Sequence, residues 1–76
     1  MDNVLTILQT IRPEENFSTS DDFINDGLLD SFDVVTLVTE LDAAFSVSID
    51  GVDIIPENFK NIESIKSLLR KKGVAL

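Results

Sequence analysis

Hydrophobic residues recur at helical spacing in three segments of the chain: residues 2–11, residues 31–45 and a segment that starts near residue 61. At about 100° per residue, the apolar positions of each segment share one face of a helix. These faces consist of Val4, Leu5, Leu8 and Ile11, then Val34, Leu37, Val38, Leu41 and Phe45, and finally Ile62, Ile65, Leu68 and Leu69. The pattern predicts an all-α fold with three main helices.

The segments between these helices carry stop and turn signals. Pro13 ends the first helix, and the polar connection over residues 12–30 contains five apolar residues that we expect to anchor it: Phe17, Phe23, Ile24, Leu28 and Leu29. "FSVSIDG" ends the second helix, and "PENF" predicts a short third helix with Pro56 in its first turn. Asn61 caps the last helix and Gly73 ends it. The prediction is a small four-helix bundle, with residues 1–76 as a single domain.

Composition limits the chemistry that the chain can perform. A hydrophobic fraction of 43% supports one small core, and the chain contains no cysteine and no histidine. Disulfides, common zinc sites and thiol or imidazole catalysis are therefore excluded. No apolar run is long enough to span a membrane, and the first residues lack the features of a secretory signal. We expect a cytoplasmic protein without membrane insertion.

Charge is distributed unevenly along the chain. The net charge is -8, and residues 13–59 contain acidic residues but no lysine or arginine. The last segment instead carries five cations: Lys60, Lys66, Arg70, Lys71 and Lys72. Such an acidic surface repels nucleic acid and attracts basic protein partners, although acidity alone also keeps a small protein soluble.

The head of the second helix combines a serine with an exposed apolar patch. Either Asp30 or Ser31 can cap the first turn. On a helical wheel, three residues point away from the core face: Phe32, Val35 and Thr39. Carboxylates surround this patch, namely Asp33, Glu40 and Asp42. An apolar spot ringed by carboxylates predicts a protein-docking surface.

The segment around Ser31 resembles that of a known protein family. "GLLDSFDVVTLVTELDAAF" resembles the attachment segment of acyl carrier proteins, in which an Asp-Ser-hydrophobic triplet opens the second helix. The order of elements is similar over nearly the whole chain. The resemblance implies that Ser31 receives 4'-phosphopantetheine from coenzyme A through a phosphopantetheinyl transferase, and that the thiol of this arm carries cargo as a thioester.

The resemblance also implies roles for the neighbours of Ser31. Asp30 would help the transferase to engage the site, and the partner-recognition surface would comprise Phe32, Val35, Glu40 and Asp42, with Asp33 and Thr39 beside them. Thr39 departs from the larger apolar residue that is frequent at this position. Apolar cargo would enter the bundle between the second and last helices, in an acyl pocket lined by Leu37, Leu41, Phe45, Ile62 and Ile65.

Different carriers differ around the serine. "GLLDSF" resembles D-alanyl carrier proteins, which serve teichoic acid D-alanylation, but "DIIPENFKNIESI" is similar instead to stand-alone acyl carriers of specialised lipid or polyketide pathways. "LLDS" lacks the pattern of peptide-synthetase carriers, and Phe32 replaces the leucine usual in fatty-acid synthesis. We therefore expect an acyl or aminoacyl carrier that is loaded by a ligase or acyltransferase.

Two other classes of function remain as alternatives. An acidic helical interaction module without a cofactor would share the charge and the exposed patch. An enzyme is disfavoured, because no histidine, cysteine, tyrosine or glycine-rich phosphate loop is present. The aspartates do not follow the spacing of a calcium-binding EF-hand loop, so no metal is expected. A monomer is expected, since one small patch does not support an obligate dimer.

Overall fold

The structure, a computed structural model, describes residues 3–76, and every regular element within them is helical. Four α-helices are present: α1 (Asn3–Ile11), α2 (Ser31–Phe45), the short α3 (Pro56–Phe59) and α4 (Ile62–Lys71). Two 3-10 turns lie between them, η1 (Phe17–Thr19) and η2 (Gly51–Asp53). The predicted all-α bundle with three main helices is confirmed; residue 2 of the predicted first helix lies outside the described residues.

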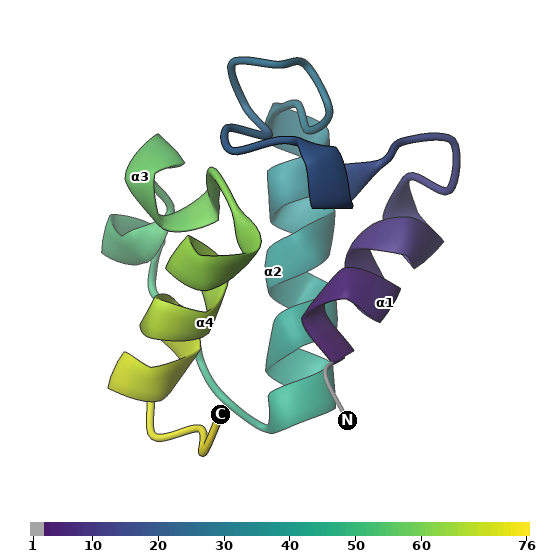
Figure 1. Ribbon diagram of the computed structural model, residues 1–76. Helices are drawn as coiled ribbons and strands as arrows, with labels where there is room; N and C mark the ends of the chain where they lie inside the picture. Colours follow the sequence, from purple (N-terminus) through teal and green to yellow (C-terminus); the bar gives the residue numbers. More distant parts are fainter. Residues whose placement is uncertain (1–2) are drawn as a thin grey trace.

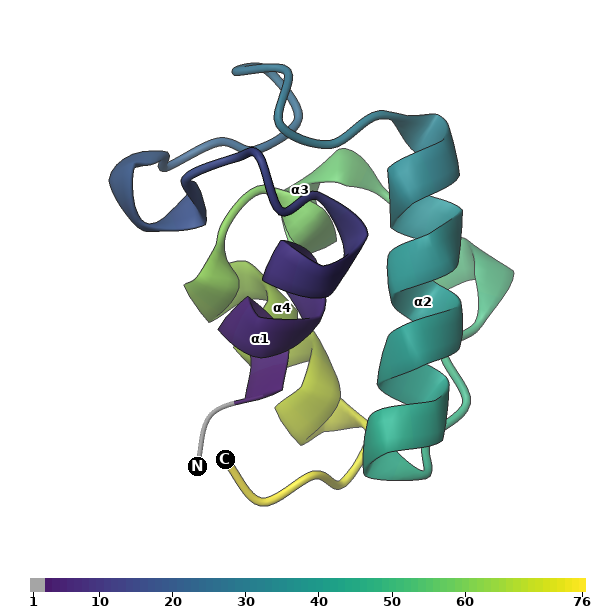
Figure 2. The same ribbon diagram turned by 90° about the vertical axis from the view of Figure 1, so that its right-hand side faces the viewer.

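In Figure 1 the long helix α2 lies between α4 and α1, and α1 packs against both α2 and α4. The view turned by 90° shows α1 in front of α4, with α3 beyond the upper part of α4 (Figure 2). α1 begins, and the chain ends, at the end of the bundle opposite the first turn of α2. That first turn therefore stands apart from both ends of the described chain.

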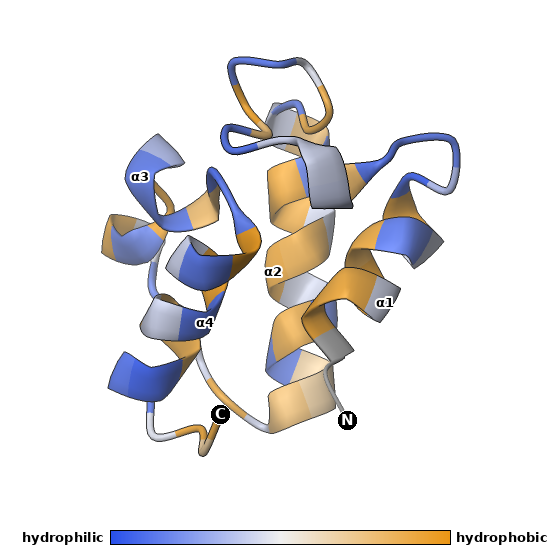
Figure 3. Cartoon of the chain, viewed as in Figure 1, coloured by the Kyte–Doolittle hydropathy of each residue, from blue (hydrophilic) through white to orange (hydrophobic). Residues whose placement is uncertain are grey.

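The apolar faces predicted from spacing form the core. The fully buried residues of the helices are Val4, Leu8, Val34, Leu37, Leu41, Phe59, Ile65, Leu68 and Leu69, and partly buried residues such as Val38, Phe45 and Ile62 pack around them. Figure 3 shows hydrophobic residues along most of α2, whereas hydrophilic residues cover much of α4. Burial of these apolar side chains is the main source of stability for so small a domain.

The connection between α1 and α2 is ordered by its own apolar residues. Phe17 and Phe23 are buried and meet edge to face, with ring centroids 5.0 Å apart. The backbone N–H of Phe23 donates to the carbonyl oxygen of Lys60 at 2.6 Å, which ties the connection to the start of α4. Gly27 supplies the positive φ of 79° that the turn before α2 requires.

Helix ends follow the signals in the sequence. The Asn61 side chain accepts a hydrogen bond from the N–H of Ser64 at 2.8 Å, and Gly73 adopts a φ of 95° after α4. Pro56 occupies the first turn of α3. Ser46 ends α2 in the left-handed conformation, with a φ of 54°, although it is not glycine.

Candidate functional site

Ser31 is the first residue of α2, and its neighbours cap the helix in its place. The Asp30 carboxylate accepts a hydrogen bond from the N–H of Asp33 at 2.9 Å, and the Asp33 carboxylate accepts one from the N–H of Asp30 at 3.1 Å. This reciprocal capping box satisfies first-turn donors without a contribution from Ser31. The Ser31 side chain is exposed, and within residues 3–76 its hydroxyl has no hydrogen-bond partner. Its oxygen is thus accessible for reaction.

The charges at the head of α2 are fixed by short contacts. The hydrogen bond from the N–H of Asp33 holds the pKa of Asp30 below its ordinary value, and the nearby positive charge of Arg12 acts in the same direction. Asp30 is therefore an anion at neutral pH. The guanidinium Nε of Arg12 lies 3.6 Å from Asp33 Oδ2 and 3.3 Å from Glu14 Oε2. This cation offsets part of the negative charge beside Ser31.

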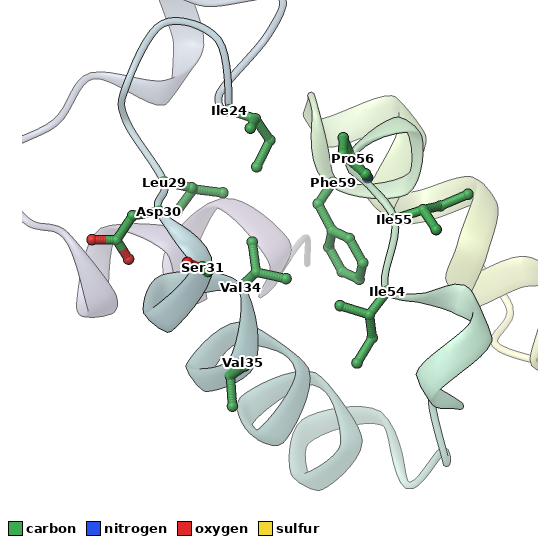
Figure 4. A pocket seen from close by; sticks show the side chains of 10 residues that line it. All are labelled: Ile24, Leu29, Asp30, Ser31, Val34, Val35, Ile54, Ile55, Pro56 and Phe59. Atoms are coloured by element: carbon green, nitrogen blue, oxygen red, sulfur yellow. The ribbon is translucent and has the colours of Figure 1, made fainter.

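An apolar groove opens beside Ser31. It has a volume of about 370 Å³ and runs between the first turns of α2 and the segment that leads into α3 (Figure 4). Its lining residues are Ile24, Leu29, Asp30, Ser31, Val34, Val35, Ile54, Ile55, Pro56 and Phe59. Apart from Asp30 and Ser31, every one of them is apolar. The groove can therefore receive an apolar group attached at Ser31.

The far wall of the groove follows from local backbone chemistry. Pro56 favours an extended conformation in the preceding residue, and Ile55 has a φ of -128° and a ψ of 153°. Ile54 and Ile55 remain 37% and 44% exposed, and Figure 4 shows the Ile54 side chain across the groove from Val34. Neither Ile54 nor Ile55 was predicted to belong to the site. The available signal was two adjacent isoleucines before a proline, outside any helical pattern.

An ion-pair cluster fixes the segment before this wall. Lys72 Nζ lies 2.6 Å from Asp53 Oδ2 and 3.3 Å from Asp50 Oδ2. The hydrogen bond to Asp53 raises the pKa of Lys72, and the same contact lowers the pKa of Asp53. η2 is thereby attached to the end of α4. This cluster was not predicted, because Lys72 lies far from Asp50 and Asp53 in the sequence.

The predicted recognition residues separate into two groups. Phe32, Val35, Thr39 and Glu40 are exposed, with Phe32 84% exposed, so an apolar patch with a carboxylate beside it does exist on α2. Asp33 and Asp42 are only partly exposed. Asp33 belongs to the capping box.

Asp42 has a structural contact of its own. Its Oδ1 accepts a hydrogen bond from the N–H of Ile49 at 3.0 Å, which holds the chain that follows α2. Residue spacing predicts a contact of this kind only when the path of the chain after the helix is known. The carboxylates of Asp33 and Asp42 therefore stabilise the local fold around the exposed patch.

The five residues predicted to line an acyl pocket lie together in the core. Leu37, Leu41 and Ile65 are fully buried, and Phe45 and Ile62 are partly buried and pack against the core. None of them lines the groove beside Ser31. Cargo would reach them only if the packed core rearranged, whereas the groove is open in the structure as it stands.

Two further observations concern the described part of the chain. Within residues 3–76, no group of three or more acidic residues is arranged to hold a metal ion. None of the helices described has both the length and the apolar character that crossing a bilayer requires.

Comparison of the chain with protein-family models, curated proteins and solved structures finds no significant match. The fold and the site thus define a small helical bundle with an accessible serine beside an apolar groove.

Proposed function

We propose that this protein is a carrier that holds acyl or aminoacyl groups as thioesters on a 4'-phosphopantetheine arm attached to Ser31. The observation that carries the proposal is the position of Ser31: it is exposed at the first residue of α2, its hydroxyl is left free by the capping box, and an apolar groove begins beside it. A site for covalent attachment needs an accessible oxygen and room for the attached group, and both are present here.

The attachment step balances with coenzyme A as the donor. The Ser31 hydroxyl oxygen forms a bond to the phosphorus of the pantetheine phosphate, the bond between the two phosphates of coenzyme A breaks, and the adenosine bisphosphate part leaves. The serine proton passes to a base of the transferase or to solvent. The arm then supplies a thiol, which the chain itself lacks because it contains no cysteine.

The charges around Ser31 favour an arm that stays in contact with solvent. The Asp30 carboxylate already occupies the N–H of Asp33 in the first turn, which would otherwise attract a phosphate. The phosphodiester would therefore remain hydrated while the apolar end of a cargo enters the groove between Val34 and Ile54. The acidic surface would attract basic enzymes that load and unload the arm.

The proposed cargo belongs to one of two classes: acyl groups, or an amino acid such as D-alanine. The lining of the groove supports an acyl chain, because eight of its ten residues are apolar and a charged amino group would lose hydration beside them. A second function, an acidic interaction module without a cofactor, is supported by Phe32 at 84% exposure. That module would not depend on the hydroxyl group of Ser31.

The test is the intact mass of the protein after incubation with coenzyme A, magnesium and a broad-specificity phosphopantetheinyl transferase. We expect a gain of one phosphopantetheine in the native chain and none in Ser31→Ala. Ser67→Ala is the matched control, because Ser67 is also an exposed helical serine and lies on α4. A native chain that is folded by circular dichroism but gains no mass would reject the carrier function and leave the interaction module.

A further inference from the structure

A single lysine near the end of the chain holds the segment that forms the far wall of the groove. Lys72 directly follows α4, and its Nζ contacts Asp53 Oδ2 at 2.6 Å and Asp50 Oδ2 at 3.3 Å. The side chains of Lys72 and Asp53 are only 22% and 23% exposed, so this contact is better shielded from solvent than an ordinary surface ion pair. The ion-pair cluster thus attaches both ends of η2 to α4.

Hydrogen bonds connect Asp53 directly to the wall of the groove. Its carbonyl oxygen accepts hydrogen bonds from the N–H of Ile55 at 3.0 Å and from the Nδ2 of Asn58 at 2.8 Å. Ile54 and Ile55 line the groove, and Asn58 belongs to α3. A displacement of Asp53 would therefore move the wall and the start of α3 with it.

Little else holds this segment in place. η2 has three residues and α3 has four, too few for either to be stable without outside contacts. Ile54 and Ile55 are too exposed to be fixed by burial. The nearest firm attachments are Ile49, which is bound by Asp42, and the buried Phe59. Within residues 3–76, the ion pairs of Lys72 join the part of the chain between these two points to the end of α4.

We propose that Lys72 is a positioning residue for the groove, and that its ion pairs with Asp53 and Asp50 keep Ile54 and Ile55 where they can enclose an apolar chain carried at Ser31. This inference rests on the proposed carrier function. When Lys72 is absent, the wall moves away from Val34, and the carried chain spends more time in solvent. Lys72 does not touch Ser31 or react; it acts through Asp53.

The experiment uses the full chain with two cargoes of different length. Acetyl- and octanoyl-pantetheine groups are transferred from their coenzyme A thioesters to Ser31 in four proteins: the native chain, Lys72→Met, Lys72→Arg and Lys71→Met. Intact mass first verifies the attachment. Thioester hydrolysis and the methyl shifts of Ile54 and Ile55 are then measured for each cargo. Lys71 is the matched control because it is an exposed neighbouring lysine in the last turn of α4.

We expect octanoyl to hydrolyse more slowly than acetyl in the native chain and to shift the Ile54 and Ile55 methyl signals. In Lys72→Met the octanoyl thioester should hydrolyse roughly two- to fivefold faster than in the native chain, in keeping with the loss of one ion-pair cluster. The acetyl rate should not change, since acetyl is too short to use the wall. Lys72→Arg keeps the charge and should restore slow hydrolysis, and Lys71→Met should behave as the native chain.

Each contrary outcome has a separate meaning. A mass gain with equal octanoyl hydrolysis in the native chain and in Lys72→Met overturns the role of Lys72 while the carrier function stands. Equal hydrolysis of the two cargoes in the native chain, with unmoved Ile54 and Ile55 signals, also overturns it, because the groove is then not occupied. Absence of any mass gain overturns the carrier function, and the inference about Lys72 with it.

Discussion

The guanidinium Nε of Arg12 lies 3.6 Å from the carboxylate Oδ2 of Asp33 and thereby connects the end of α1 to the first turn of α2. The same Asp33 oxygen accepts the hydrogen bond from the N–H of Asp30. Arg12 Nε is buried, and no hydrogen-bond partner is found for it within residues 3–76. The attraction is therefore electrostatic, and it acts on both carboxylates of the capping box.

Arg12→Gln should lower the free energy of unfolding by roughly 0.2–1 kcal/mol, since it removes a partly exposed ion-pair network but leaves the capping box intact. Urea denaturation measures the change. Arg70→Gln is the control, because Arg70 is exposed and has no ion pair with a carboxylate side chain within residues 3–76; its Nε donates to the carbonyl oxygen of Leu76 at 3.4 Å. Equal losses in both variants would show that the Arg12 contacts contribute nothing specific.

Substitutions at Asp30 and Ser31 should separate capping from attachment. Ser31→Ala should change the free energy of unfolding by no more than about 0.5 kcal/mol, because the hydroxyl is exposed and makes no contact to lose. Asp30→Ala should lower the Tm clearly, because it removes the acceptor for the N–H of Asp33. Thermal unfolding of both variants without the arm tests this. A large loss in Ser31→Ala would mean that the serine stabilises the helix start.

Ser46→Gly should raise the free energy of unfolding by about 0.5–1 kcal/mol. Ser46 has a φ of 54°, a conformation that costs a side chain more than glycine, and this gain exceeds the extra flexibility of glycine in the unfolded chain. Ser48→Gly is the control, since Ser48 is exposed, lies outside the helices and has no positive φ. Denaturant midpoints give the comparison, and a gain at Ser48 as large as at Ser46 would contradict the explanation.

The Lys72 cluster should give the Tm a dependence on pH at both extremes. The pKa of Asp53 lies below its ordinary value of 3.8, so the unfolded chain binds more protons than the folded one there. The resulting stability is present above pH 3.8 and is lost as the pH falls through the folded pKa. The pKa of Lys72 is raised from 10.5, so its contribution is complete below pH 10.5 and is lost as the pH rises through the folded value.

Lys72→Met should therefore lower the Tm at neutral pH. It should also make the Tm less dependent on pH at both the acidic and the alkaline extreme. Lys71→Met should leave the dependence of the Tm on pH nearly as in the native chain, because the Lys71 charge has the smallest of the effects on the pKa of Asp53. Thermal unfolding by circular dichroism across the pH range provides the measurement. If the Tm of Lys72→Met depends on pH as steeply as that of the native chain, the ion-pair cluster is not the cause of this dependence.

Local pattern predicted the helices well, because their apolar faces and caps depend on residues that are close in sequence. Ser31–Phe45 was predicted with the bounds that α2 has, and the caps at Asn61 and Gly73 are present. The buried phenylalanines of the first connection were also expected, since large apolar residues in a polar segment need a core to enter.

The groove and its supports were not predicted, because they depend on how distant segments meet. Ile54 and Ile55 line the groove beside α2 only because of the path that the chain takes after Phe45. The ion pair of Lys72 with Asp53 requires the end of α4 to lie beside η2. The wheel of α2 gave the right exposed face. It could not show that Asp33 and Asp42 use their carboxylates in local hydrogen bonds.

The arrangement of the bundle also determines where the molecule can be extended. α1 begins, and the chain ends, at the end opposite the first turn of α2 (Figure 1), and Ser31 is the first residue of that turn. A purification tag, a fluorescent protein or a surface tether joined before α1 or after residue 76 would thus leave the exposed Ser31 at the opposite end of the bundle. A support attached in this way would leave the first turn of α2 open to solvent.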